Sequence, residues 1–432
     1  MKKVSYYIAS LLLLGACSPA PHSTTMKDAS EAYVKLVLEI GLYDSDFVDA
    51  YYGPEEWRPD EDQKEAEFPL QRFQETADKL KTMLYEVDKT EFTSLDNARI
   101  DMLTKQIKAV RTKVNMMGGQ VYSFDEEAKL LYDAEPPHFT QDYFDSLLVG
   151  LDNRLPGEGT VASRYNAYAK GFVIPKDKLD TVFQTAIIEA RKRTDTQFQL
   201  PDNENFVLEY VTDKSWSGYN YYQGKSQSLI QLNTDFPIFI ERAIDLACHE
   251  GYPGHHVFNA LLEQNLVDGK GWVEFSVYPL FSPQSLIAEG SANYGIDVAF
   301  PGETRIAYEK EVLFPLAGID PASADLYYEI QALRSKLNYA GNEAARQYLN
   351  KEITREEAAV WLEKYLLYEP DRALQRTRFI DQYRSYVINY NLGKDLVAAY
   401  VERNGGTADA PQKRWEVFKE LLSNPHTAST LK

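Results

Sequence analysis

The chain has 432 residues, 44% of them hydrophobic and 26% charged, which is an ordinary composition for a folded protein with a substantial core. Its formal net charge of −19 makes nucleic acid and the anionic surface of a membrane poor partners, because both would be repelled. It has only two cysteines, and it shows no internal repeat and no low-complexity segment.

The first 17 residues have the pattern of a bacterial export signal. Lys2 and Lys3 give a positive start, residues 8–14 form a short apolar run, and the sequence LGAC at residues 14–17 provides a cleavage site. The apolar run is too short to span a bilayer comfortably. We therefore expect this segment to be removed on export.

Small residues directly before Cys17 resemble the bacterial lipobox, in which the cysteine becomes the lipidated first residue of the mature protein. We expect Cys17 to anchor the protein to the membrane through its lipid; the alternative is an ordinary signal peptide with an incidental cysteine. Ser18 favours sorting to the outer membrane of the bacterial envelope. Residues 18–28 are predicted to be a polar tether.

Residues 29–204 show helical patterns almost throughout. The clearest helix is predicted over residues 95–117, where apolar residues recur at helical spacing and two glycines follow. Similar patterns cover residues 29–46, 69–87 and 176–194. We interpret this part as a helical scaffold.

Residues 205–233 read as strands instead. Residues 206–211, 218–224 and 228–233 are β-type segments separated by turn residues. We expect a small antiparallel sheet, with residues 228–233 as an edge strand that holds an extended peptide through main-chain hydrogen bonds.

An aromatic cluster falls within the predicted sheet. Its members are Trp216, Tyr219, Tyr221 and Tyr222. They either line the site or form the packed face of a hairpin, and the sequence does not decide between the two.

The segment HEGYPGHH at residues 249–256 holds three of the six histidines of the chain. Zinc hydrolases use neutral imidazoles to hold the metal and a neighbouring carboxylate to take a proton from bound water. The common H-E-x-x-H spacing fails here because position 253 is proline. Cys248, just before the segment, is predicted to be a small buried residue rather than a ligand or nucleophile.

Pro253 should make the motif helix bulge or break, because it lacks a backbone donor and clashes with the preceding turn. A bulge that absorbs two residues brings His255 to the place that is normally one turn after His249. We therefore favour His249 and His255 as zinc ligands, with His256 as the competitor or as a polar group that faces the substrate. Glu250, beside His249, is the predicted general base.

A third ligand is expected from a following helix, as in gluzincin-type sites. Residues 286–294 are apolar around one carboxylate, Glu289, and a buried carboxylate is costly unless it is paired or bound to a metal. The alternative is a glutamate that stabilises a helix start. Asn293, one turn later, is placed to orient a ligand.

Residues 373–390 are predicted to be helical, with arginines among tyrosines. One of the arginines Arg376, Arg378 and Arg384 near the site would bind a substrate carboxylate and favour carboxypeptidase-like action; pairing with surface acids is the alternative. The tyrosines that could stabilise an oxyanion are Tyr383, Tyr386 and Tyr390.

The segment HEGYPGHH, followed by EGSANY at residues 289–294, resembles the bacterial DUF885 family, which carries H-E-x-x-P-G-H-H and then E-G-x-A-x-Y. That family is grouped with zinc-peptidase-like proteins and includes many lipoproteins. The resemblance extends over most of the mature chain and is sharp over residues 215–294. Of a later family motif, P-G-Q-A-x-S-Y-K-x-G, only Tyr390 and Gly393 are kept, so only a role for Tyr390 is implied.

These observations predict a mainly α (α+β) protein with a helical zincin-like, gluzincin-related metallopeptidase fold and a small sheet before the metal-binding helix. Residues 29–204 would form a helical N-terminal part and residues 205–425 a metallopeptidase-like catalytic part, either separate or as one continuous unit. One Zn²⁺ per chain is expected.

The predicted function is that of a lipid-anchored, zinc-dependent metallohydrolase, a peptidase in which Glu250 assists the attack of zinc-bound water. Two alternatives remain: a lipoprotein that keeps the fold for binding or assembly without catalysis, and a zinc amidohydrolase acting on a non-peptide amide. The expected partners are a peptide or other small amide substrate and the membrane, through the Cys17 lipid.

Overall fold

The computed structural model describes residues 25–432, so the signal segment and Cys17 lie outside the described residues. The structure is 65% helix and 7% strand, which confirms the prediction of a mainly α protein with small sheets. Among residues 25–432, no helix combines the length and the apolar character that a membrane span requires.

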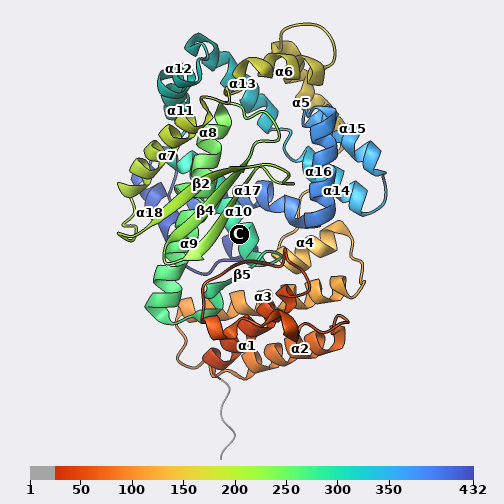
Figure 1. The fold of residues 1–432 in the computed structure, drawn as a ribbon, viewed down its shortest axis with the longest axis vertical. Helices are drawn as coiled ribbons and strands as arrows, with labels where there is room; N and C mark the ends of the chain where they lie inside the picture. Colours follow the sequence, from red (N-terminus) through yellow and green to blue (C-terminus); the bar gives the residue numbers. More distant parts are fainter. Residues whose placement is uncertain (1–24) are drawn as a thin grey trace, which may run out of the picture.

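Three helices form a layer at the base of the molecule in Figure 1: α1 (Met26–Gly41), α2 (Leu70–Glu86) and α3 (Ser94–Met117). Local sequence sets their ends. Thr25 and Thr93 each form a capping box with an aspartate three residues later, which satisfies the free N–H groups of α1 and α3. Gly118 ends α3, as the glycine pair predicted.

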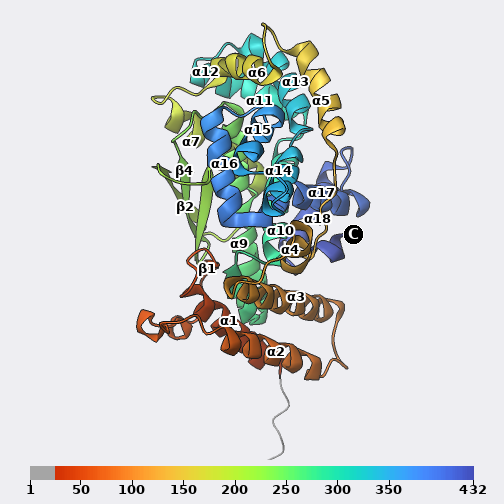
Figure 2. The same ribbon diagram turned by 90° about the vertical axis from the view of Figure 1, so that its right-hand side faces the viewer.

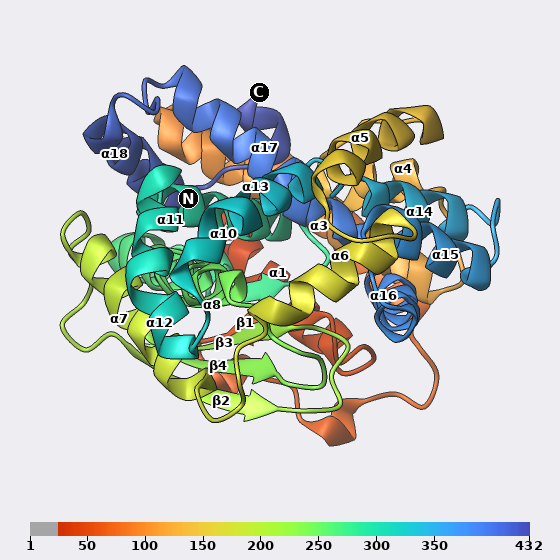
Figure 3. The ribbon, with the colours of Figure 1, turned by 90° about the horizontal axis from the view of Figure 1, so that it is seen from above.

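Four further helices precede the sheet: α4 (Phe124–Tyr132), α5 (Gln141–Arg154), α6 (Val161–Ala169) and α7 (Leu179–Asp195). Eleven follow it in the described chain: α8 (Glu241–Leu246), α9 (His255–Leu262), α10 (Pro283–Ala299), α11 (Glu303–Tyr308), α12 (Phe314–Ala317), α13 (Ala324–Ser335), α14 (Ala340–Leu349), α15 (Arg355–Tyr365), α16 (Pro370–Tyr383), α17 (Ile388–Arg403) and α18 (Pro411–Leu422). Seen from above, α10 lies near the middle, with α14, α15 and α16 to one side and α7 and α18 to the other (Figure 3).

The sheet before the motif has three strands: β2 (Asn205–Val211), β3 (Gly218–Gly224) and β4 (Gln227–Asn233). The strand order is β2-β4-β3, in which β2 pairs with β4 in parallel and β3 pairs with β4 in the antiparallel sense. The prediction of an antiparallel sheet was therefore wrong in part, because β2 joins the far side of the β3–β4 hairpin. The prediction that residues 228–233 form an edge strand was also wrong, since β4 is central. Figure 2 shows the sheet along one side of the molecule, with α16 beside it.

A second, two-stranded sheet links the base layer to the rest of the chain. Strand β1 (Val48–Tyr51) pairs with β5 (Val277–Pro279), and the register shifts between Val48 and Ala50. Asp49 lies at this irregularity. Bulges commonly re-aim a side chain next to a functional site.

The buried apolar side chains form one continuous cluster that includes Val37 of α1, Leu103 of α3 and Leu286 of α10. One buried ion pair joins the base layer to the later chain. Arg99 of α3 donates from Nη2 to Glu274 Oε2 at 2.9 Å, and the two side chains are only 11% and 4% exposed. Another ion pair, between Arg154 and Glu329, is exposed on the surface.

Replacing Arg99 with alanine should lower the free energy of unfolding by about 3–5 kcal/mol, because Glu274 would stay buried without its partner. Urea unfolding of purified protein measures this. Arg154→Ala is the matched control, and its unfolding midpoint should hardly move because its ion pair is exposed to solvent. Equal midpoints for the two variants would contradict the assigned role of Arg99.

Candidate metal centre

The HEGYPGHH motif spans a break between two helices, as Pro253 predicted. Helix α8 continues into a π-helical turn, Ala247–Gly251, in which the N–H of Tyr252 bonds to the carbonyl of Ala247 at 3.0 Å. The chain then bends, and α9 starts at His255. The wide turn and the bend together absorb the extra residues of this motif, so His255 lies beside His249.

Gly254 makes this return of the chain sterically feasible. A Cβ atom added there would lie 2.0 Å from the carbonyl oxygen of His249 and 2.3 Å from that of Cys248. Real Cβ atoms do not approach backbone this closely, so the motif needs glycine at position 254 for a reason of space.

Three ligand-type atoms converge on one point, and they come from His249, His255 and Glu289. The Nε2 atoms of the two histidines are 3.2 Å apart, and Glu289 Oε2 lies 3.2 Å from the first and 3.6 Å from the second. Ligands 2.0–2.1 Å from a tetrahedral zinc ion are roughly 3.3–3.4 Å from one another. The spacing of the three atoms therefore fits the edges of such a site.

Only one of the two carboxylate oxygens of Glu289 forms a hydrogen bond in the described chain. Its Oε1 accepts a hydrogen bond of 2.7 Å from the Tyr386 hydroxyl, while Oε2 is buried without a hydrogen-bond partner in the described chain and has only the two imidazoles near it. A buried carboxylate oxygen left in this way is costly. A metal ion between Oε2 and the two imidazoles would satisfy it.

His249 is oriented by Asn293, as its position one turn after Glu289 suggested. The Nδ1 atom of His249 lies 3.1 Å from Asn293 Oδ1, and Asn293 Nδ2 donates to the carbonyl of Tyr390 at 3.1 Å. If Nδ1 carries the proton, Nε2 turns its lone pair toward the cluster, which is the tautomer that a metal ligand requires.

The charges of the cluster reinforce one another. Burial disfavours a charged His255, but the negative charges of Glu289, Glu250 and Asp49 outweigh it and raise the pKa of His255 to about 9. Burial would raise the pKa of Glu289, yet the two histidines hold it well below its usual range. The point where the three atoms meet therefore favours positive charge.

Glu250 stands beside the cluster with its carboxylate unpaired. Within residues 25–432, no side chain forms a hydrogen bond or ion pair with it, and burial raises its pKa. Gly218 at the start of β3 leaves room for this side chain, since a Cβ there would lie 2.7 Å from Glu250 Oε1. Glu250 is therefore next to the cluster without being one of its converging ligands.

His256 does not join the cluster, so the alternative that it replaces His255 does not fit the structure. It is fully buried, with Nε2 2.8 Å from Glu204 Oε2 and Nδ1 2.9 Å from Ser228 Oγ. The Tyr252 hydroxyl donates to the same carboxylate oxygen at 2.6 Å. These contacts tie the start of α9 to the sheet, which makes His256 a structural residue.

Tyr390 lies against the cluster. Its ring stacks near His249, with centroids 6.4 Å apart and planes at 26°. The other two candidate tyrosines have different positions: Tyr386 is committed to Glu289, and Tyr383 packs on Phe379 with centroids 4.6 Å apart. Of the three, Tyr390 is the one whose ring lies against His249.

Of the candidate arginines, only Arg376 lies near the cluster. Arg384 pairs with Glu127 at 2.7 Å and Arg378 is exposed, whereas the Arg376 guanidinium lies 6.0 Å from the Tyr390 ring. Cys248 is fully buried, and burial raises the pKa of its thiol, as expected for an inert core residue.

Asp49 is a site residue that the sequence did not reveal. It comes from the irregularity in β1 and accepts a short hydrogen bond from the Tyr219 hydroxyl. Burial raises its pKa to about 6, and His255, Glu289 and Glu250 all act on it electrostatically. The rings of Tyr219 and Tyr221 pack at a tilt with centroids 4.5 Å apart, so part of the aromatic cluster lies beside Asp49. Tyr222 points elsewhere and donates to Glu263.

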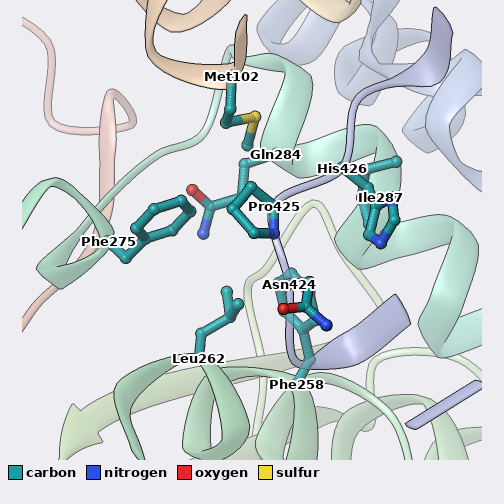
Figure 4. Close-up of a pocket in the computed structure, with 9 residues that line it drawn as sticks. All are labelled: Met102, Phe258, Leu262, Phe275, Gln284, Ile287, Asn424, Pro425 and His426. Atoms are coloured by element: carbon teal, nitrogen blue, oxygen red, sulfur yellow. The ribbon is translucent and has the colours of Figure 1, made fainter. Parts of the chain in front are cut away.

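The cavity drawn in Figure 4 is separate from the cluster. It is small and is lined by residues of α3, α9, α10 and the C-terminal segment, among them Met102, Phe258, Ile287 and His426. None of its lining residues belongs to the converging set. We assign no function to it.

No protein-family model matches the chain, and no curated protein matches it. The resemblance to the DUF885 family therefore stays a prediction.

The solved structures that resemble this chain include two bacterial proteins. One is a protein from Colwellia psychrerythraea described as a "putative lipoprotein", with 16% identity and a TM-score of 0.51 over 83% of this chain. The chain spans only 65% of that protein's length. The other, from Shewanella oneidensis, is described as a "putative lipoprotein of unknown function", with 12% identity and a TM-score of 0.44 over 82% of this chain and 71% of that one. The first likeness concerns the fold alone, and the second is too weak to support an argument.

Helices α10 and α17, which carry Glu289, Asn293 and Tyr390, touch backbone to backbone at Gly290 and Gly393. A Cβ at Gly393 would lie 2.6 Å from the carbonyl oxygen of Leu286. Gly393→Ala should therefore lower the free energy of unfolding by about 1–3 kcal/mol. Thermal unfolding measures this. Gly171→Ala, at an exposed position with nothing within 4 Å, should leave the melting temperature unchanged. A fully stable Gly393→Ala protein would contradict the close crossing.

Proposed function

We propose that the protein is a zinc-dependent metallohydrolase, and that it hydrolyses peptides. One observation carries this proposal: two imidazole nitrogens and an otherwise unbonded carboxylate oxygen converge at zinc-site spacing. An unpaired glutamate stands directly beside them. Structural ion pairs do not need such an arrangement, because two imidazoles facing one another gain little unless a cation lies between them.

The donor set fits zinc better than the other common metals. Two nitrogens and one carboxylate oxygen are the ligands of several catalytic zinc sites, whereas calcium and magnesium prefer oxygen alone. When bound, zinc would supply a Lewis acid that polarises a carbonyl and makes a coordinated water more acidic.

The residues around the cluster have separate roles in this proposal. Glu250 accepts a proton from the attacking water and passes it to the leaving amine. Tyr390 donates from its hydroxyl to the carbonyl oxygen as negative charge develops there. Tyr386 and Asn293 do not meet the substrate; they fix the orientation of Glu289 and His249.

The proposal also includes a lipid anchor at Cys17. The sequence around Cys17 supports it, and the similar structure from Colwellia psychrerythraea is described as that of a "putative lipoprotein". The protein would then act in the bacterial cell envelope, with the outer membrane favoured by Ser18. The negative surface of the chain agrees with attachment through a lipid rather than through basic residues.

Protein that starts at Ser18 should contain about one zinc per chain by mass spectrometry, and His255→Ala should remove it, because one of three protein ligands is lost. His138→Ala, which changes an exposed histidine, should keep the metal. Zinc retained in the His255→Ala protein would contradict the ligand set.

Glu250→Gln should keep the zinc but cut peptide hydrolysis by about 10²–10⁴-fold, since it removes the general base and leaves the ligands in place. A peptide library screened beside a set of acylated amino acids measures this and separates a peptidase from a hydrolase of other amides. Unchanged turnover in the variant would refute the assigned role of Glu250.

Tyr386→Phe should weaken zinc binding about 10–100-fold, because Glu289 would lose the hydrogen bond that orients it. Competition with a chromogenic chelator measures the affinity. Tyr348→Phe, which removes a surface hydrogen bond to Asp381, is the control and should bind zinc like the unmodified protein. Equal affinities for the two variants would show that Tyr386 does not support the ligand.

A further inference from the structure

Four arginines gather around one tyrosine on the side of the metal centre where Tyr390 lies. Arg242 is on α8, Arg334 is on α13, and Arg372 and Arg376 are one turn apart on α16. Tyr368 lies just before α16. The Arg372 guanidinium lies 5.6 Å from the Tyr368 ring, and all four arginines act on the Tyr368 phenol electrostatically.

Three of the four arginines have no acidic partner. In the described chain, neither Arg334, Arg372 nor Arg376 forms an ion pair. Their guanidinium groups face aromatic rings instead: Arg334 lies 5.2 Å from Tyr165, Arg372 5.6 Å from Tyr368, and Arg376 4.2 Å from Phe379. Arg334 Nε is also buried without a hydrogen-bond partner.

This absence of acids is unusual for this protein. The chain has 65 acidic residues against 46 basic ones, and several of its enclosed arginines are paired, as Arg99 is with Glu274 and Arg305 with Glu309. Partly buried charges are normally paired because an unpaired one is costly. Acidic residues outnumber basic ones in this chain, yet these three arginines form no ion pair with any of them in the described residues.

The arginines repel one another. Burial lowers the pKa of Arg372, the phenol of Tyr368 opposes this, and the charges of Arg242, Arg376 and Arg334 lower the pKa further. Burial alone would raise the pKa of Tyr368, but the four guanidinium groups outweigh it and lower the pKa below the usual 10. A bound anion would relieve this repulsion.

The arginine cluster adjoins the metal centre by two routes. The Tyr390 ring contacts both groups, with the Arg376 guanidinium 6.0 Å and the His249 imidazole 6.4 Å from its centroid. On the other side, Arg372 Nη2 lies 3.4 Å from Ser217 Oγ, and the next residue, Gly218, packs against the Glu250 carboxylate. An anion held by the arginines would therefore lie a short distance from the scissile bond.

We propose that Arg242, Arg334, Arg372 and Arg376 form a subsite for a carboxylate of the peptide substrate. This inference rests on the proposed function for the identity of the substrate. Guanidinium forks match carboxylates in bidentate geometry. A peptide offers a carboxylate either at its C-terminus or on an acidic side chain, and the experiment below separates these two sources.

The test measures peptide binding by calorimetry in zinc-loaded Glu250→Gln protein, which should bind without turnover. Three probes are used: an N-acetylated tetrapeptide with a free C-terminus, its C-terminal amide, and an amide in which one residue is glutamate. The free acid or the glutamate peptide should bind about 10–100-fold more tightly than the plain amide. Whichever is favoured identifies the source of the carboxylate, and equal affinity of all three would overturn the subsite.

Added to Glu250→Gln, Arg372→Gln and Arg376→Gln should each remove most of this preference while leaving the affinity for the plain amide and the zinc content unchanged. Arg378→Gln is the matched control, since Arg378 is exposed on the same helix. Both site variants should melt at or above the temperature of their parent, because they lower the repulsion. A lower melting temperature with weaker binding of every peptide would show a merely structural role and overturn the proposal.

This design separates the inference from the proposed function. If the unmodified protein hydrolyses no peptide but the carboxylate preference and its loss in the arginine variants are seen, the subsite stands and the hydrolase proposal fails. If the unmodified protein cleaves the free acid and the amides equally well and binding shows no preference, the hydrolase proposal stands and the subsite fails.

Discussion

The close crossing of α10 and α17 is the constraint on which the candidate metal centre depends. Where Gly290 meets Gly393, neither helix has a side chain, so the two backbones touch. Glu289 and Asn293 project from one helix, and Tyr390 from the other. Larger residues at the crossing would push the two helices apart. Glu289 and Asn293 would then move away from Tyr390. The contact between Gly290 and Gly393 therefore determines the positions of the side chains at the candidate metal centre.

The sequence predicted the parts of the site that are encoded locally. A proline within the motif implied a broken helix, and the break does place His255 next to His249. An isolated carboxylate among small and apolar residues identified Glu289, and helical spacing identified Asn293. Each of these inferences used fewer than ten neighbouring residues, a range in which backbone geometry limits the alternatives.

The parts that could not be predicted depend on contacts between distant segments. Asp49 reaches the site through an irregular strand of the base layer, and its partner Tyr219 lies 170 positions later in the chain. No local pattern reveals that pairing. The order of the three strands was missed for the same reason, since the β3–β4 hairpin is local whereas the parallel pairing of β2 is not. The arginines come from three helices, and only Arg376 was among the candidates that the sequence suggested.

The protein combines a strongly negative net charge with a group of half-buried arginines next to its candidate metal centre. The net charge of −19 keeps anionic surfaces away, while arginines without acidic partners gather beside Tyr390. In the proposed hydrolase this contrast has a purpose, because the overall charge opposes nonspecific binding of acidic polymers and the enclosed arginines still select one carboxylate.

The central claim is that His249, His255 and Glu289 hold one metal ion, and anomalous diffraction at the zinc absorption edge tests it most directly. A crystal of the zinc-loaded protein should show a single strong anomalous peak roughly 2.0–2.2 Å from His249 Nε2, His255 Nε2 and Glu289 Oε2. A crystal that shows no peak there, or its strongest peak at other residues, would contradict the account.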